Sequence, residues 1–291
     1  MGYRVNTTDT LATWWPSPAK LNLFLHINGR RSDGFHELQS VFQMLSYGDE
    51  LAFEVTHEPS ICMHTPLVGV ADDDNLIIKA ARALQKHCHC KLGCTIYLNK
   101  KLPMGGGIGG GSSNAATTLR VLNELWDCKL NIDQLAELGL ALGADVPVFV
   151  HGHTAFAEGV GEILTPIAVD SKVYLVVFPN CHVATATIFG SPNLPRNTPK
   201  INAKDYQFDI TQNDCQNLVI DQYSEVAKLL QWLLQFAPSR MTGTGACVFA
   251  VFDDHEKAEQ VFNKLPSDWH GFIAQGVDES PLNTALRAWT D

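Results

Sequence analysis

The segment LPMGGGIGGGSSNAA, residues 102–116, decides the fold of this chain, because six of the seven positions from Gly105 to Gly111 are glycine. Glycine costs conformational entropy and offers no side chain, so a run of this density indicates that a bare backbone is needed there. The residues before it, 94–103, have the pattern of a strand. After it, apolar residues recur at helical spacing, at Ala115, Leu119, Leu122 and Trp126. We expect that helix to begin at Ser112 or Ser113, because serine is a favoured N-cap.

A strand, a glycine loop and a helix in succession form an arrangement that binds phosphate through backbone N–H groups and the positive end of the helix. Three familiar phosphate loops do not fit. A P-loop needs a lysine before its serine, and Ser112 follows Gly111 directly. A dinucleotide loop needs a strand that ends in an acidic residue about 20 positions later. Residues 127–135, which stand at that distance, read instead as a loop and a helix. The H-R-D and D-F-G motifs of protein kinases do not occur.

The rest of the chain predicts an α+β protein in two halves, residues 1–168 and 169–291. In the first half, the predicted strands are 19–27 (half-buried), 35–44 and 94–103, and the predicted helices are 74–86, 131–142 and the one after the glycine loop. In the second half, the predicted strands are 172–179, 246–252 and 271–277, the predicted helices are 217–236 and 254–265, and residues 190–200 read as a surface loop.

Composition limits the classes of function. A hydrophobic content of 45% and a charged content of 18% are typical of a globular protein with a core. The net charge of −10 argues against general nucleic-acid binding, which needs a basic face. The chain has neither a long apolar run nor a signal-like start, so we expect a cytoplasmic protein. The His87–Cys94 cluster lacks the second, distant pair of ligands of a structural zinc site, so no metal site is predicted.

Two residues are candidates for phosphoryl-transfer chemistry, which needs a group that orients a hydroxyl and a group that offsets negative charge. Asp145, just after the helix that ends at Gly143, is the candidate for the first role, and a turn or N-cap aspartate is the alternative. Lys20 is the candidate for the second, with an ordinary strand lysine as the alternative. The strand period of two places Lys20 and Asn22 on one face. The segment TGTGACVF, residues 242–249, is either a tight turn or a second loop that approaches the glycines from the other half.

Four segments occur in the order and spacing of known motifs: PSPAKLNLFLHI (16–27), LPMGGGIGGGSSNAA (102–116), GADVPVFVHG (143–152) and TGTGACVF (242–249). On these motifs the chain resembles the GHMP kinases, the family of galactokinase, homoserine kinase and mevalonate kinase, over residues 14–290. It is most similar to the branch that phosphorylates 4-diphosphocytidyl-2-C-methyl-D-erythritol. The resemblance implies a two-domain fold, with an N-terminal mixed sheet and helices (ribosomal protein S5 domain 2-like) and a C-terminal ferredoxin-like α+β domain.

The resemblance also implies an activity and a set of site residues. The γ-phosphoryl group of ATP, with Mg²⁺, would pass to the 2-hydroxyl of the methylerythritol moiety, in the non-mevalonate route to isoprenoid precursors. Lys20 and Asp145 match the catalytic lysine and aspartate of the family. The implied nucleotide-binding residues are Asn75, Lys100, Met104, Gly105, Gly106, Gly107, Ile108, Gly109, Gly110, Gly111, Ser112 and Ser113. The implied substrate-binding residues are Asn22, Phe35, His36, Thr185 and Phe189. Phe35 and Phe189 would stack on the two faces of the cytosine, and His36 would hydrogen-bond its edge.

Two alternatives remain open within this resemblance: another small-molecule GHMP kinase, such as one acting on homoserine, and a non-catalytic GHMP-fold ligand sensor. The aromatic pair Phe35 and Phe189 counts against the first, and the presence of both Lys20 and Asp145 counts against the second. The implied partner is a small molecule carrying a cytidine diphosphate group, with no nucleic acid and no membrane, and the protein is expected to be a monomer or weak homodimer. Asn114 stands where the family commonly has aspartate, so no protein ligand for Mg²⁺ is assigned.

Overall fold

The computed structural model describes residues 13–290. The strands of this part of the chain form one ten-stranded sheet in the order β3-β4-β2-β10-β7-β9-β8, with β1 and β5 paired to β2 and β6 paired to β5. The strands are β1 (Trp15–Arg30), β2 (His36–Thr56), β3 (Ile61–Met63), β4 (Gly93–Asn99), β5 (Ala155–Glu158), β6 (Ile163–Pro166), β7 (Val173–Phe178), β8 (Ser239–Met241), β9 (Val248–Phe252) and β10 (His270–Val277). The helices are α1 (Leu76–His87), α2 (Gly110–Leu125), α3 (Ile132–Leu140), α4 (Val146–His151), α5 (Thr185–Gly190), α6 (Gln216–Gln222), α7 (Ser224–Leu233), α8 (His255–Phe262) and α9 (Pro281–Thr290), with short 3₁₀ turns at Ala203–Asp205 and Phe208–Ile210.

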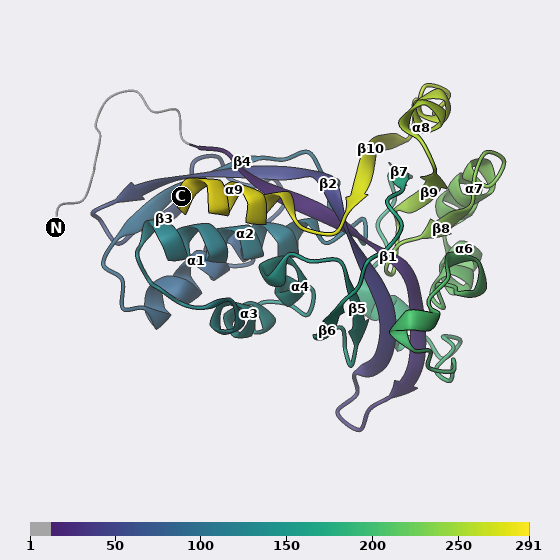
Figure 1. The fold of residues 1–291 in the computed structure, drawn as a ribbon, viewed down its shortest axis with the longest axis horizontal. Coiled ribbons are helices and arrows are strands. Elements are labelled where there is room, and N and C mark those ends of the chain that lie inside the picture. The colour runs from purple at the N-terminus through teal and green to yellow at the C-terminus, as the bar shows by residue number, and fades with distance from the viewer. Residues whose placement is uncertain (1–12, 291) are drawn as a thin grey trace.

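The long antiparallel hairpin of β1 and β2 joins the two halves of the molecule (Figure 1). Both strands exceed the predicted ranges 19–27 and 35–44. The prediction of a half-buried first strand is wrong, because nearly all of β1 between Trp15 and Ile27 is buried. Each half of the molecule covers a part of the hairpin, so the face that carries Lys20 is also removed from solvent.

The second half forms a βαββαβ unit of the ferredoxin-like kind, as expected. Its strands lie in the order β10-β7-β9-β8 and are all antiparallel. Helices α6, α7 and α8 pack on this sheet (Figure 1), and their apolar side chains form one core with those of the strands. β10 also pairs with β2 through Gly276 and Val277, so the sheet continues from one half into the other.

The first half contains helices α1 to α4, of which α2 packs on β1 and β2, and it also receives α9. Helix α9 lies beside α2 in Figure 1, and its Leu282 and Leu286 belong to the same core as Trp15. The Trp289 ring meets the Trp15 ring edge-on at 5.5 Å. The division of the chain between residues 168 and 169 therefore stays a prediction. The structure shows in addition that residues 281–290 pack with the first half.

Two helix predictions are wrong. The predicted helix 217–236 is broken into α6 and α7 at Tyr223, whose φ of −125° and ψ of 95° are extended. The helix after the glycine loop begins at Gly110 rather than at Ser112 or Ser113, and its N-cap is Gly109 in the left-handed region. Within residues 13–290, no helix combines the length and the apolar character that crossing a membrane requires.

Candidate active site

The glycine loop lies between β1 and the loop at residues 242–247. The Lys20 N–H donates to the Ile108 carbonyl at 3.0 Å, and the Cys247 N–H donates to the Gly106 carbonyl at 3.1 Å. Both alternatives for residues 242–249 are therefore found together: the segment contacts the glycine loop, and its Gly245 N–H donates to the Thr242 carbonyl, as in a tight turn. Segments about 90 and 140 residues apart in the chain are held together by backbone hydrogen bonds, which leave no room for side chains.

The close packing of the protein itself explains several of the glycines. Gly107 and Gly109 have φ of +74°, which favours glycine. A Cβ on Gly107 would lie 2.6 Å from the Thr242 carbonyl oxygen, and one on Gly109 would lie 2.6 Å from Phe149 Cζ. Gly111 differs, since its Cβ would meet only Leu76 Cδ1, at 3.6 Å. Gly107 and Gly109 are thus required by the fold, whereas Gly111 leaves the start of α2 open.

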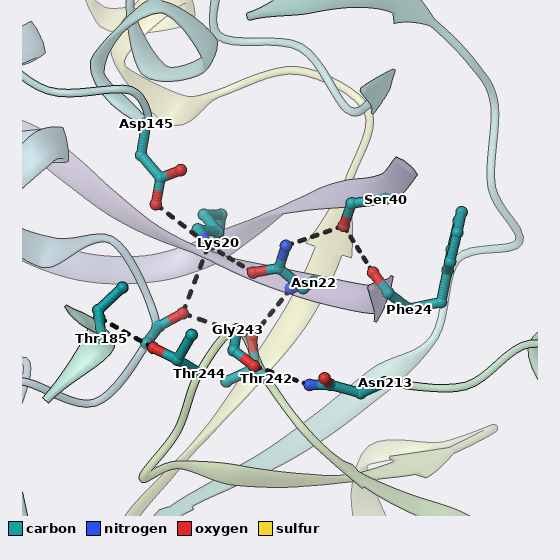
Figure 2. Close-up of polar contacts among 11 residues, drawn as sticks. Lys20, Asn22, Phe24, Ser40, Asp145, Thr185, Asn213, Thr242, Gly243 and Thr244 are labelled. Atoms are coloured by element: carbon teal, nitrogen blue, oxygen red, sulfur yellow. Dashed lines mark hydrogen bonds and ion pairs between the residues drawn. The ribbon is translucent and has the colours of Figure 1, made fainter. Parts of the chain in front are cut away.

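Lys20 is the centre of a buried polar cluster on β1 (Figure 2). Its side chain is 3% exposed, and its Nζ donates to Asn22 Oδ1 at 2.5 Å and to the Gly107 carbonyl at 3.4 Å. The Asn22 amide in turn donates to Ser40 Oγ at 2.8 Å, and the Asn22 backbone N–H donates to Thr242 Oγ1 at 2.9 Å. These contacts hold the ammonium group in one place, at the point where the strand hairpin meets both loops.

Asp145 completes this cluster with an ion pair, its Oδ2 lying 3.3 Å from Lys20 Nζ. It occupies the N-cap position of α4, as the alternative reading of the sequence expected, but its side chain makes no capping hydrogen bond. Figure 2 shows the carboxylate directed toward Lys20 instead. The Asp145 side chain is 38% exposed, so the carboxylate is open to a ligand while the ammonium of Lys20 lies behind it.

A cavity of about 600 Å³ opens in front of this pair, a volume suited to a small-molecule ligand. All of the residues expected to bind the acceptor substrate line it: Asn22, Phe35, His36, Thr185 and Phe189. Lys20, Asp145 and Gly107 line it as well. The cavity therefore connects the charged pair with an aromatic end formed by Phe35 from the turn before β2 and Phe189 from α5.

His36 lies at this aromatic end in a defined state. Its ring stacks on Phe189 with centroids 5.2 Å apart, and its Nε2 accepts from Arg196 Nε at 2.9 Å. Burial lowers the pKa of His36, and the positive charges of Arg196 and Arg30 lower it further. The imidazole is therefore neutral near pH 7.

A second cavity of about 350 Å³ lies on the other side of the glycine loop. Its lining includes Asn75, Lys100, Met104, every residue from Gly105 to Gly111, and Ser112. Asn75 caps α1 by accepting from the Ile77 N–H at 3.0 Å, while its buried Nδ2 has no partner within residues 13–290. An unpaired buried amide donor in a cavity is suited to an acceptor on a ligand. Lys100 Nζ is held by Asp49 Oδ2 at 2.7 Å.

The two cavities share Gly107, Gly109 and Ser112, so the glycine loop separates them and also joins them. The first N–H groups of α2 have no partner within the helix and lie at this junction. Ser113 is the one predicted site residue that lines neither cavity. Its hydroxyl is fully buried and lies 2.9 Å from Ser17 Oγ, and its N–H donates to the Gly109 carbonyl.

The oxygen atoms at the junction fit a magnesium ion that is bound mainly by phosphates and water. Asp145 offers a carboxylate and Ser112 a hydroxyl at the border of the two cavities. Asn114 has its side chain in a different network, since it donates to Asp49 Oδ2 at 3.1 Å and accepts from Ser17 Oγ at 2.7 Å. Among the described residues, no three side chains of histidine, cysteine, aspartate or glutamate converge on a possible metal position.

Sequence reasoning missed several residues of the site. Arg196 falls in the segment 190–200, which reads as an ordinary surface loop, and Ser40 falls within a strand whose pattern gives no signal for it. Thr244 belongs to the small-residue segment 242–249, but the sequence pattern predicts no role for its side chain. It lines the larger cavity, and its Oγ1 lies 2.9 Å from Thr185 Oγ1 (Figure 2).

Comparisons with known proteins show which family the chain resembles over nearly its whole length. The family models described as the N-terminal and C-terminal domains of GHMP kinases match residues 75–153 and 201–271. A protein of Pseudoalteromonas atlantica named 4-diphosphocytidyl-2-C-methyl-D-erythritol kinase is 63% identical over 278 residues, which cover 96% of this chain and 97% of that protein. A protein of Shewanella loihica with the same name is 55% identical, covering 96% of this chain and 98% of that protein. A crystal structure of 4-(cytidine 5'-diphospho)-2C-methyl-D-erythritol kinase matches with a TM-score of 0.80 and 28% identity, covering 91% of this chain and all of that chain.

Proposed function

This chain belongs to the GHMP kinases, in the branch of the 4-diphosphocytidyl-2-C-methyl-D-erythritol kinases, and we propose that it transfers the γ-phosphoryl group of ATP to the 2-hydroxyl of that cytidyl compound. The observation that carries the proposal is the Lys20–Asp145 pair, which lines the larger of two cavities that share residues of the glycine loop. One cavity takes the phosphoryl donor and the other takes the acceptor.

Lys20 supplies a fixed positive charge for the transfer. Its ammonium is held by Asn22, the Gly107 carbonyl and Asp145, so it does not need to reorganise when negative charge develops on the phosphoryl group. A preorganised cation in a site of low water content stabilises such a transition state far more than a mobile one. This position replaces the lysine that a P-loop carries next to its glycines.

Asp145 receives or orients the acceptor hydroxyl. Its carboxylate is partly exposed to the larger cavity and lies next to the charge of Lys20, so an acceptor hydroxyl that donates to this carboxylate lies beside a fixed positive charge. The oxygen–hydrogen bond of the alcohol breaks as the bond to phosphorus forms. The proton passes to the Asp145 carboxylate, the bond between the γ-phosphorus and the β–γ bridging oxygen breaks, and ADP leaves with that oxygen.

The aromatic end of the larger cavity binds the cytidine group. Phe35 and Phe189 line it, and stacking of a base on aromatic rings contributes about 1–3 kcal/mol per base in single-stranded nucleic-acid sites. At the other side of the glycine loop, Asn75 Nδ2 donates to the nucleotide base, and the N–H groups at the start of α2 bind its phosphates. Asp145 or Ser112, together with the phosphates, would hold a Mg²⁺ ion, which would supply further positive charge near the transferring group.

The proposed function is tested by ADP release with the cytidyl compound, homoserine and mevalonate offered separately. We expect turnover with the cytidyl compound and none with the other two. The aromatic end of the cavity favours this substrate over the homoserine-type alternative, because homoserine has no ring to place between Phe35 and Phe189. No turnover of the cytidyl compound, or faster turnover of a competitor, contradicts the proposal.

A further inference from the structure

Arg196 connects two elements of the aromatic end that are far apart in the chain. Its Nε donates to His36 Nε2 on β2 at 2.9 Å, and its Nη2 donates to the carbonyl of Phe189, at the end of α5, at 3.0 Å. Two more donors reach the carbonyls of Ser191, at 2.7 Å, and Leu194, at 2.9 Å. None of the ion pairs within residues 13–290 includes this guanidinium. Its planar set of donors therefore binds three backbone carbonyls and one imidazole nitrogen.

The hydrogen bond from Arg196 decides where His36 carries its proton. A guanidinium only donates, so Nε2 of His36 accepts, and the proton of the neutral ring lies on Nδ1. Within the described residues, Nδ1 has no hydrogen-bond partner, and His36 lines the larger cavity. A donor is therefore offered to a ligand, and the O2 and N3 atoms of a cytosine ring are acceptors.

The same guanidinium also sets the place of the two rings. His36 and Phe189 stack at 5.2 Å with an angle of 29°, and Arg196 is bonded to the side chain of the first and to the backbone of the second. A lysine at this position keeps the charge but not the set of separate donors, so it does not reproduce these contacts.

We propose that Arg196 is a positioning residue for pyrimidine recognition: it holds His36 and Phe189 against each other and keeps the imidazole proton on Nδ1, facing an acceptor edge of the base. The assignment of the ligand rests on the proposed function, whereas the state of His36 does not. The two are therefore tested by separate measurements.

The first test reads the tautomer directly, without substrate. In ¹⁵N spectra of the histidine side chains, the His36 signal is assigned by its loss in His36→Asn. We expect the proton on Nδ1 in the wild-type protein and a shift toward the Nε2 tautomer in Arg196→Met, which has no donor. A wild-type His36 with its proton on Nε2 overturns the proposal, whatever the substrate is and whether or not the variant folds.

The second test separates binding of the acceptor from the chemistry. We expect Arg196→Met to raise the KM for the cytidyl compound about tenfold, which corresponds to about 1.4 kcal/mol, with kcat and the KM for ATP within about twofold of wild type. Arg196→Lys should give an intermediate KM. The matched control is Lys200→Gln, which removes the ion pair at 2.5 Å from the same loop to Glu37, the neighbour of His36, without a contact to either ring. An unchanged KM in Arg196→Met, or an equal fall in kcat and in affinity for ATP, overturns the proposal.

The pH dependence gives a readout that a purely structural role would not change. The charged groups that act on His36 are the cations Arg196 and Arg30, so removing Arg196 lets the pKa of His36 rise toward its ordinary value of about 6.5. A protonated imidazole carries a proton on both nitrogens. The KM of Arg196→Met for the cytidyl compound should therefore fall as the pH decreases from about 7.5 to about 5.5, and this fall should begin at a higher pH than any change in the KM of wild type or Lys200→Gln. A profile of Arg196→Met parallel to wild type overturns the proposal. If wild type does not turn over the cytidyl compound, the proposed function fails and the tautomer test still stands.

Discussion

Substituting alanine at two positions of the glycine run tests which glycines the fold requires. At Gly107 the backbone φ is +74°, and a Cβ would lie 2.6 Å from the Thr242 carbonyl oxygen and 2.9 Å from that of Gly245. At Gly111 the backbone is helical, and the nearest atom to a Cβ is Leu76 Cδ1 at 3.6 Å. The two substitutions add the same methyl group to the same loop, so each is the control for the other.

The two substitutions are expected to change the free energy of unfolding in opposite directions. A left-handed backbone costs alanine about 1–2 kcal/mol, and overpacking against atoms that do not rotate away costs about 1–3 kcal/mol. Both atoms that Gly107→Ala meets are backbone oxygens of the loop bonded to Gly106, so this loop must move. We expect Gly107→Ala to lower the free energy of unfolding by about 3 kcal/mol. Gly111→Ala should raise it by about 0.5–1 kcal/mol, because alanine loses less entropy in a helix.

Urea unfolding followed by the fluorescence of the six tryptophans measures both values under one set of conditions. The reasoning is refuted if Gly107→Ala is as stable as wild type, or if the two variants lose equal stability. Either result would mean that Gly107 is not restricted more than Gly111, so that contact with the loop at residues 242–247 does not distinguish the two positions.

Three further predictions concern the charged pair, the nucleotide cavity and a buried histidine. Asp145→Asn should lower kcat in the ADP-release assay by about 10²–10⁴-fold. The control Asp221→Asn, on the exposed face of α6, should have a kcat near that of wild type. Comparable kcat values in the two variants would show that the Asp145 carboxylate has no role in the transfer. Asn75→Ala should raise the KM for ATP and lower the free energy of unfolding by about 1 kcal/mol, since the side chain both caps α1 and offers a free donor; an unchanged KM speaks against the second role. The free energy of unfolding should fall as the pH decreases from about 7.5 to about 5.5, because burial lowers the pKa of His26 in the folded protein and the unfolded chain takes up the proton first. His26→Gln should reduce the slope of this free energy against pH, as measured by urea titration. An unchanged slope would contradict this cause.

The local elements near the glycine loop could be predicted because their signals are short-range. The pattern around residues 102–116 placed a strand, a loop and a helix in the right order, and the structure has β4 and α2 there. The start of α2 was missed, since a side-chain cap at Ser112 or Ser113 is the usual signal, whereas here Gly109 in a left-handed conformation begins the helix. The break at Tyr223 was missed for a similar reason. The apolar period of α6 continues into α7 on the same core, so the pattern alone does not show the break.

Residues of the site that act through distant partners were beyond local patterns. Arg196 lies in a loop rich in proline and asparagine, and its meaning appears only when His36, 160 residues earlier, lies 2.9 Å away. The position of helix α9 is a second example, because its Leu282 and Leu286 share a core with Trp15, far away in the sequence. Neither contact leaves a trace in spacing or composition.

The sequence by itself determined which chemistry the chain carries: a phosphate-binding loop and, through motif resemblance, a candidate lysine, a candidate aspartate and two aromatic residues. The tertiary structure alone decided how these act together. It buried Lys20 against Asn22 and Asp145, placed the glycine loop between two cavities, and brought the Arg196 Nε donor to 2.9 Å from His36 Nε2. The physical reason is that periodicity and turn preference depend on neighbours in the chain, whereas burial, charge pairing and the position of a proton depend on neighbours in space.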